Sequence, residues 1–167
     1  MNTKKRLIIL LTVVAGSVVL VGAALATAPS GIVSATVLAR AGFVDPVDIK
    51  FKVGQAPEVI HVPDARDTVM QRIEIGPGGH TGWHSHPGPV VVLVKAGELT
   101  LYDGDDPRCT GRTYSAGQAF MDIGQGHVHI GRNQSSSQNV ELLVTYFDVP
   151  PGGAFRIDAV DPGNCSF

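Results

Sequence analysis

Beyond the first 28 residues, hydrophobic positions come in short runs rather than in helical stripes. No stretch of ten or more residues keeps a clear 3.6-residue period, and 20 Gly and 11 Pro are distributed along the chain. In residues 68–75, TVMQRIEI, apolar Val69, Ile73 and Ile75 alternate with Arg72 and Glu74, the period of a half-buried strand. The chain is therefore predicted to be mostly β-strand.

Further runs of the same kind recur at intervals of roughly ten residues, which favours a closed or double-sheet β architecture. The runs before residue 68 are predicted to form peripheral strands. We expect strands within residues 32–43, 47–54, 90–106 and 111–124 (two strands in each of the last two), 126–133 and 140–150.

The N-terminal residues follow a different pattern. Lys4, Lys5 and Arg6 precede an uncharged run over residues 7–26 that ends on small residues. This is the layout of a secretory signal peptide, and its length would also suit a retained membrane-anchor helix. In either interpretation the rest of the chain is secreted or extracytoplasmic, with membrane contact only through this segment. We expect a signal peptide or anchor (1–28), an N-terminal extension (29–66) and one main domain (67–167).

The charge balance gives evidence on nucleic-acid binding, and the cysteine count gives evidence on a disulfide. After residue 28 the 15 acidic residues outnumber the 10 basic ones and no basic run remains, so the sequence gives no support for nucleic-acid binding. Cys109 and Cys165 are the two cysteines. In an oxidising compartment they are predicted to form a disulfide rather than two free thiols.

Two His-x-His pairs carry the candidate chemistry. His84 and His86 lie two residues apart in a predicted strand, as do His127 and His129. Residues at this spacing face the same side of a strand with Cα atoms about 7 Å apart, so their imidazoles can converge on one metal ion. The alternative is that each histidine is a half-buried residue that only forms hydrogen bonds. Two such pairs favour a shared metal, but spacing alone does not choose between His127 and His129.

The other two histidines are weaker candidates. His80, in a Gly-rich turn, has the right parity to approach the first pair and is an additional candidate ligand. His61 has no local partner and is expected to be an ordinary surface or strand histidine.

The spacing of these residues resembles the two motifs of the cupin superfamily, G-x5-H-x-H-x3,4-E-x6-G and G-x5-P-x-G-x2-H-x3-N. The resemblance implies a double-stranded β-helix, a small jelly-roll barrel of six to eight strands, over the main domain. It also implies His84, His86 and His129 as metal ligands, with His127 or His80 as additional candidates, and a homodimer. The matching residues are Gly78, His84, His86 and Gly97 for the first motif, and Gly117, Gly124, Gly126, His129 and Asn133 for the second.

The sequence departs from these motifs at two points. The acidic ligand expected by resemblance falls at Val90 or Val91, and Gly124 replaces the motif proline. Three neutral imidazoles remain, and they suit Fe(II), Zn(II), Ni(II), Cu(II) or Mn(II) better than Mg(II) or Ca(II).

The pocket lining is predicted only coarsely. Side chains that share parity with the His84–His86 pair should form an apolar floor, with one or two aromatic walls, whereas Trp83 has the opposite parity and is expected outside the barrel or under the preceding turn. The floor residues are Val90, Val92 and Val94, and the wall candidates are Phe120 and Tyr102.

The sequence thus predicts an exported metal-binding cupin whose partner is a small molecule. Three roles remain open. The protein is a small-molecule dioxygenase or related enzyme, which the resemblance to three-histidine cupins allows, or a non-catalytic binding or sensing module, or a domain whose metal is purely structural.

Overall fold

The computed structural model describes residues 26–53 and 59–167. Every regular element in these two ranges is a strand, which confirms the all-β prediction. The expected signal or anchor helix lies outside the described residues. Within these ranges there is no helix long and apolar enough to cross a membrane.

Most strands follow the predicted runs, but the strand expected at 68–75 extends over Asp67–His80, so His80 ends a strand and does not lie in the predicted Gly-rich turn. The strand expected at His84 is present as a short element at 84–85, whereas short strands at 60–62 and 157–158 were not predicted. The elements are β1 (Ser30–Ala41), β2 (Ile49–Phe51), β3 (Ile60–Val62), β4 (Asp67–His80), β5 (His84–Ser85), β6 (Val90–Ala96), β7 (Glu98–Asp103), β8 (Arg112–Ser115), β9 (Ala119–Asp122), β10 (His129–Arg132), β11 (Val140–Val149) and β12 (Ile157–Asp158).

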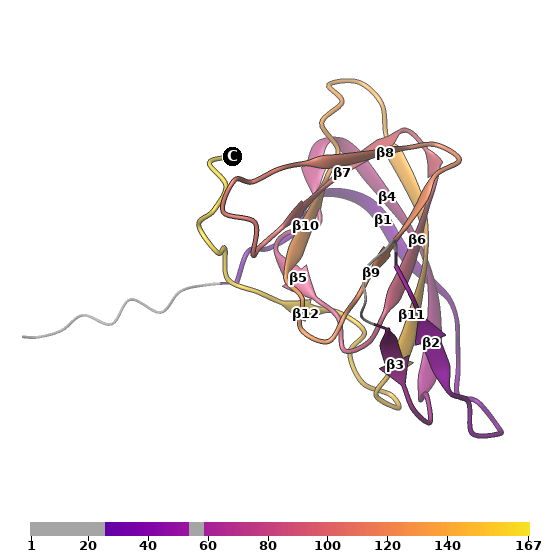
Figure 1. Ribbon diagram of the computed structural model, residues 1–167. Helices are drawn as coiled ribbons and strands as arrows, with labels where there is room; N and C mark the ends of the chain where they lie inside the picture. The colour runs from indigo at the N-terminus through magenta and orange to yellow at the C-terminus, as the bar shows by residue number, and fades with distance from the viewer. Residues whose placement is uncertain (1–25, 54–58) are drawn as a thin grey trace, which may run out of the picture.

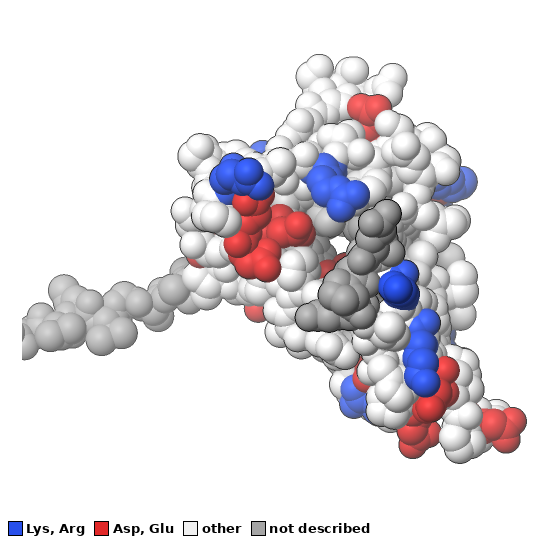
Figure 2. Space-filling view, viewed as in Figure 1, with Lys and Arg blue, Asp and Glu red and all other residues white. Residues whose placement is uncertain are grey.

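Ten of these strands form one antiparallel sheet that curls into a nearly closed barrel (Figure 1). The main path runs β12-β5-β10-β4-β11-β6-β9, with β1 paired to β4 and β7 paired to both β10 and β8. Strands β2 and β3 form a separate two-stranded sheet. On the face shown in Figure 2, Lys and Arg side chains are scattered and form no continuous patch.

The barrel is filled by the inward-facing residues of its long strands. In β11 the alternation places Val140, Leu142, Val144 and Tyr146 inside, each at most 4% exposed. The inward valines of β6 pack against them in the same cluster. Burying an aliphatic side chain of this size contributes about 1.5–3 kcal/mol, so this alternation is the main source of the barrel's stability.

Strand β1 is more integrated than the predicted peripheral strand. It pairs with β4 from Ser30 opposite His80 to Ala41 opposite Thr68, with three register shifts. The sheet has room for it because β4 pairs with β11 on one edge and would leave the N–H and C=O groups of its other edge without partners. The packing of Ile32 against the core adds to this pairing.

One arginine connects β1 to the rest of the barrel. Arg40 Nε donates to Asp67 Oδ2 (2.7 Å), and its two Nη atoms donate to the backbone oxygens of Gly153 and Pro150. The hydrogen bond from Arg40 holds the pKa of Asp67 below its ordinary value.

This ion pair predicts a loss of stability in acid. Because the pKa of Asp67 is lower in the folded than in the unfolded state, its contribution is complete above the unfolded pKa, near 3.8, and disappears as the pH falls through the lowered folded pKa. We therefore expect Asp67→Asn to flatten the fall of the melting temperature between about pH 5 and pH 2. The exposed Asp45→Asn is the control. Parallel curves for wild type and Asp67→Asn would refute the assignment.

The predicted disulfide is present. Cys109 and Cys165 are bonded, with Cα atoms 5.2 Å apart. The bond ties the C-terminal region to the loop between β7 and β8, next to the end of the barrel that carries the histidines.

Candidate metal centre

Three buried histidines meet at one end of the barrel. His84 lies in β5, His86 follows directly after it, and His129 opens β10 opposite His84 in the antiparallel register. Each histidine is 4–6% exposed, and one ring nitrogen of each lies within 4.8 Å of the others. The structure thus brings together the three histidines that the cupin resemblance implied.

Backbone carbonyls set the protonation of two of these rings. His84 Nδ1 lies 2.8 Å from the oxygen of Gly82, and His86 Nδ1 lies 2.7 Å from the oxygen of Phe155. A carbonyl oxygen only accepts, so both Nδ1 atoms must carry the proton and donate it. This leaves Nε2 with a free lone pair, which is the form of the ring that binds a metal.

Burial keeps the cluster neutral. It lowers the pKa of His84 and His129 well below the ordinary histidine value, and it lowers the pKa of His86 as well. A metal binds imidazole only in its neutral form. Near neutral pH these rings are already in that form, so metal binding does not require them to release a proton.

A buried carboxylate that the sequence reading missed lies behind His129. Asp122, 4% exposed, ends β9 and pairs with Val90 of β6. Asp122 is therefore the cross-strand neighbour of Val90, which is one of the two positions where the family motif places its acidic residue. Asp122 Oδ1 lies 3.5 Å from His129 Nδ1, a buried nitrogen with no hydrogen-bond partner in the structure. A small shift of the ring would complete a carboxylate–histidine pair that orients Nε2.

His127 belongs to a different environment. Its Nδ1 lies 2.9 Å from Asp122 Oδ1, and its Nε2 lies 3.8 Å from carboxylate oxygens of both Asp103 and Asp105. The hydrogen bond to Asp122 raises the pKa of His127. It falls outside the three-histidine group but forms a second candidate group with Asp122 and His129. One histidine therefore connects the two groups.

The remaining histidines lie away from the cluster. His80 Nδ1 accepts a hydrogen bond from Gly82 N (3.1 Å), and His80 belongs to neither candidate metal group. His61 is a half-exposed residue of β3 near Asp48, as expected for an ordinary surface histidine.

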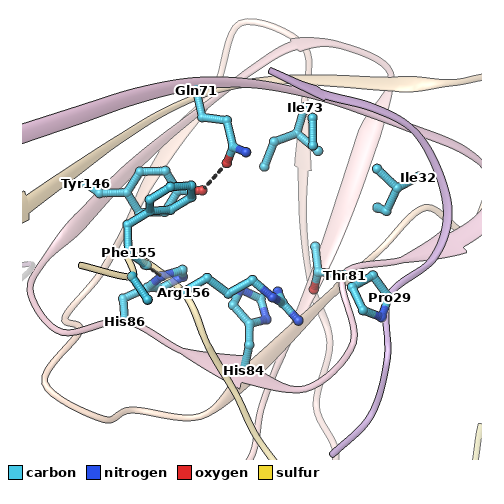
Figure 3. Close-up of a pocket in the computed structure, with 12 residues that line it drawn as sticks. Pro29, Ile32, Gln71, Ile73, Thr81, His84, His86, Tyr146, Phe155 and Arg156 are labelled. Atoms are coloured by element: carbon cyan, nitrogen blue, oxygen red, sulfur yellow. Dashed lines mark hydrogen bonds between the residues drawn. The ribbon is translucent and has the colours of Figure 1, made fainter. Parts of the chain in front are cut away.

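A cavity of about 290 Å³ adjoins His84 and His86 (Figure 3). Tyr146 donates a hydrogen bond to Gln71 (2.8 Å) on its wall, and burial raises the pKa of Tyr146 so that the phenol stays protonated. A smaller cavity reaches all three histidines. The larger cavity is lined by Pro29, Ile32, Ala35, Gln71, Ile73, Thr81, His84, His86, Tyr146, Ala154, Phe155 and Arg156.

The predicted pocket lining is partly right. Val90, Val92 and Phe120 line the smaller cavity, whereas Val94 is core that lines neither cavity. Tyr102 contacts Phe167 instead of lining a cavity. Trp83 is 1% exposed and stacked with Phe167, and it lines neither cavity, which fits the prediction that placed it away from the pocket floor.

Replacing the carboxylate behind His129 should weaken the site without removing a ligand. We expect Asp122→Asn to reduce metal affinity about 10- to 100-fold, the usual effect of losing a partner that orients a ligating histidine. Competition with a chromophoric chelator measures this, with the 81%-exposed Asp105→Asn as the matched control. Equal affinities for the two variants would show that Asp122 does not act on His129.

The other motif residues have the geometry that the resemblance requires. Gly97 and Gly126 have φ angles of 73° and 88°, a region that favours glycine. Asn133, 1% exposed, donates to the backbone oxygens of Ile75, Gly76 and Gln138. Both motifs therefore hold the barrel around the histidines. In its antiparallel barrel and in these motif residues the domain resembles the cupins.

Several solved structures match part of this barrel. The polyketide cyclase RemF from Streptomyces resistomycificus is 23% identical, with a TM-score of 0.45 over 57% of this chain and 64% of that chain. An oxalate oxidase is 27% identical, with a TM-score of 0.41 over 48% of this chain and 41% of that chain. A cupin domain of an XRE-family transcriptional regulator from Enterobacter cloacae is 24% identical, with a TM-score of 0.40 over 50% of this chain and 82% of that domain.

The matched region spans less than two thirds of the cyclase and of the oxidase. No family model and no curated protein matches the chain.

Proposed function

We propose that this protein is an exported cupin enzyme that holds a divalent transition metal on His84, His86 and His129 and acts on a small organic molecule in the adjoining cavity. The observation that carries the proposal is the convergence of three neutral imidazoles, two of them with Nε2 freed by a backbone carbonyl, beside that cavity. The nitrogen donor set suits Fe(II), Zn(II), Ni(II), Cu(II) or Mn(II).

The number of ligands favours an open site over a structural one. Structural zinc sites close with four protein ligands, whereas catalytic sites keep three and leave a position for water or substrate. Here Val90 and Val91 stand where the motif has its acidic ligand, and His127 is paired with Asp122 instead of joining the three histidines.

The metal would supply the chemistry, acting as a Lewis acid or activating a bound molecule. Apart from the two histidines, the larger cavity is lined by apolar and uncharged polar side chains and Arg156, with Tyr146 as a protonated phenol. The chain's own residues would bind the substrate, orient it and exclude water. A dioxygenase or related reaction fits this division of roles.

A second function uses the same site without turnover. The described lining of the larger cavity contains no carboxylate or thiol to serve as a general base, which favours a binding or sensing module. The disulfide supports export in both cases, since such bonds persist in oxidising compartments.

Spectroscopy of the metal-loaded full chain tests the open site. With Co(II) as the probe, we expect azide to change the visible absorption because it enters a position that the protein leaves free. A spectrum insensitive to azide would indicate a closed structural site. Oxygen uptake by the iron-loaded protein over thiols, diketones and phenolics then separates a dioxygenase from a binding module.

A further inference from the structure

The larger cavity is lined by one cationic side chain, Arg156, that uses only part of its hydrogen-bonding capacity. Arg156 directly precedes β12, and its Nε donates to Asp158 Oδ1 at 2.8 Å. Its Nη2 atom, in contrast, is buried and has no hydrogen-bond partner in the structure. A buried guanidinium nitrogen left without an acceptor is costly, because it has lost water and gained no bond.

The rest of the cavity wall does not supply this acceptor. Gln71 Oε1 already accepts from Tyr146, and the nearby side chains of Ile32, Ile73 and Phe155 are apolar. Figure 3 shows Arg156 beside His84 and His86, with Gln71 and Ile73 across the cavity. Among the described residues only Asp158 accepts a hydrogen bond from Arg156, so a ligand in the cavity can supply a further acceptor to the guanidinium.

The charge balance indicates which kind of acceptor fits. Arg156 is the one cation among the described residues that line this cavity, and Asp158, which is 54% exposed, already faces its Nε atom. One guanidinium with a solvated counter-charge suits a monoanion, and a carboxylate matches the planar Nη donors of arginine. In the metal-free cavity a phosphate dianion would bring more charge than Arg156 alone can neutralise.

Building on the proposed function, we propose that the cavity binds a small monocarboxylate with an apolar body. Its carboxylate accepts from the guanidinium of Arg156, and its body packs against Ile32, Ile73 and Phe155, next to the histidine cluster. At about 290 Å³ the cavity is at the small end of the range for ligand sites, which limits the body to a ring or a short chain.

Matched pairs of acids and amides test this proposal by calorimetry on the full chain. The probes are benzoate with benzamide and hexanoate with hexanamide, each measured on metal-free and on zinc-loaded protein. We expect at least one acid to bind about 10- to 100-fold more tightly than its amide, the effect of one charge-assisted hydrogen bond. Phenyl phosphate, added as a third arm on the metal-free protein, should bind more weakly than benzoate.

Substitutions then test whether Arg156 causes the preference for the acid over the amide. Arg156→Gln should remove it, Arg156→Lys should retain part of it because the charge stays, and Arg108→Gln, at an arginine 85% exposed outside the cavity, should leave it unchanged. Equal affinity for acid and amide, no binding at millimolar concentration, or a preference that survives in folded Arg156→Gln would overturn the proposal. Metal binding is measured separately, so an acid preference in a protein that binds no added metal would refute the proposed function but not the Arg156 site.

Discussion

Replacing His84 with alanine is expected to lower the affinity for Zn(II) or Co(II) more than about 100-fold. Losing a residue that only orients a ligand costs about 10- to 100-fold, so losing a ligand should cost more. His84 sits between the other two rings, with centroids 4.8 Å from His86 and 4.4 Å from His129. Competition with a chromophoric chelator measures the affinity.

Two variants sharpen this test. His61→Ala removes a histidine of the separate β2–β3 sheet and should leave metal affinity unchanged. His127→Ala should have a smaller effect than His84→Ala, because His127 contacts Asp122 and lies outside the three-histidine group. If His84→Ala binds as tightly as wild type while His127→Ala does not, the metal belongs to the group of Asp122, His127 and His129.

Gly124→Ala is expected to destabilise the fold by more than about 4 kcal/mol, a size reached only by severe packing or backbone defects. Gly124 has φ of 65°, and a Cβ added there would overlap the carbonyl oxygen of Gly88. Its N–H also donates to Asp122 Oδ2 (3.1 Å), so the turn that carries Gly124 positions the carboxylate behind His129. Urea denaturation with wild type and variant measured in parallel gives the difference.

Gly126→Ala provides the matched control for this glycine. Gly126 also has a positive φ, 88°, but a Cβ there meets nothing within 4 Å. The Gly126→Ala variant should lose only about 1–2 kcal/mol of folding stability, the cost of holding an alanine in the left-handed backbone conformation. Equal losses for the two variants would mean that the contact with Gly88 does not constrain the turn.

Much of the barrel follows from local pattern. Alternation in residues 68–75 and 140–149 marks strands because one face of each meets the core, and the structure buries Val69, Ile75 and Val144 accordingly. Parity also places His84 and His86 on one face. Strand parity does not distinguish His127 from His129, so the choice of His129 came from the family resemblance. In the structure the turn before β10 directs His127 toward Asp122.

The remaining parts of the site depend on which strands pair. Asp122 reaches His129 because β9 pairs with β6, and no local pattern fixes that register. The sequence nonetheless contained an indication of this carboxylate. Asp122 lies two residues after Phe120, so both face the same side of a strand, and it precedes the second His-x-His pair. Arg156 lies about 70 residues from His86, and only the closure of the barrel brings them to one cavity.

The most direct test of the metal centre is elemental analysis of the purified full chain alongside its His84→Ala and His129→Ala variants. We expect about one transition-metal ion per chain in the wild type, and neither variant should retain it while still folding. A wild type that is free of metal, and whose melting temperature does not change on adding Zn(II), Co(II) or Fe(II), would contradict a metal site at His84, His86 and His129.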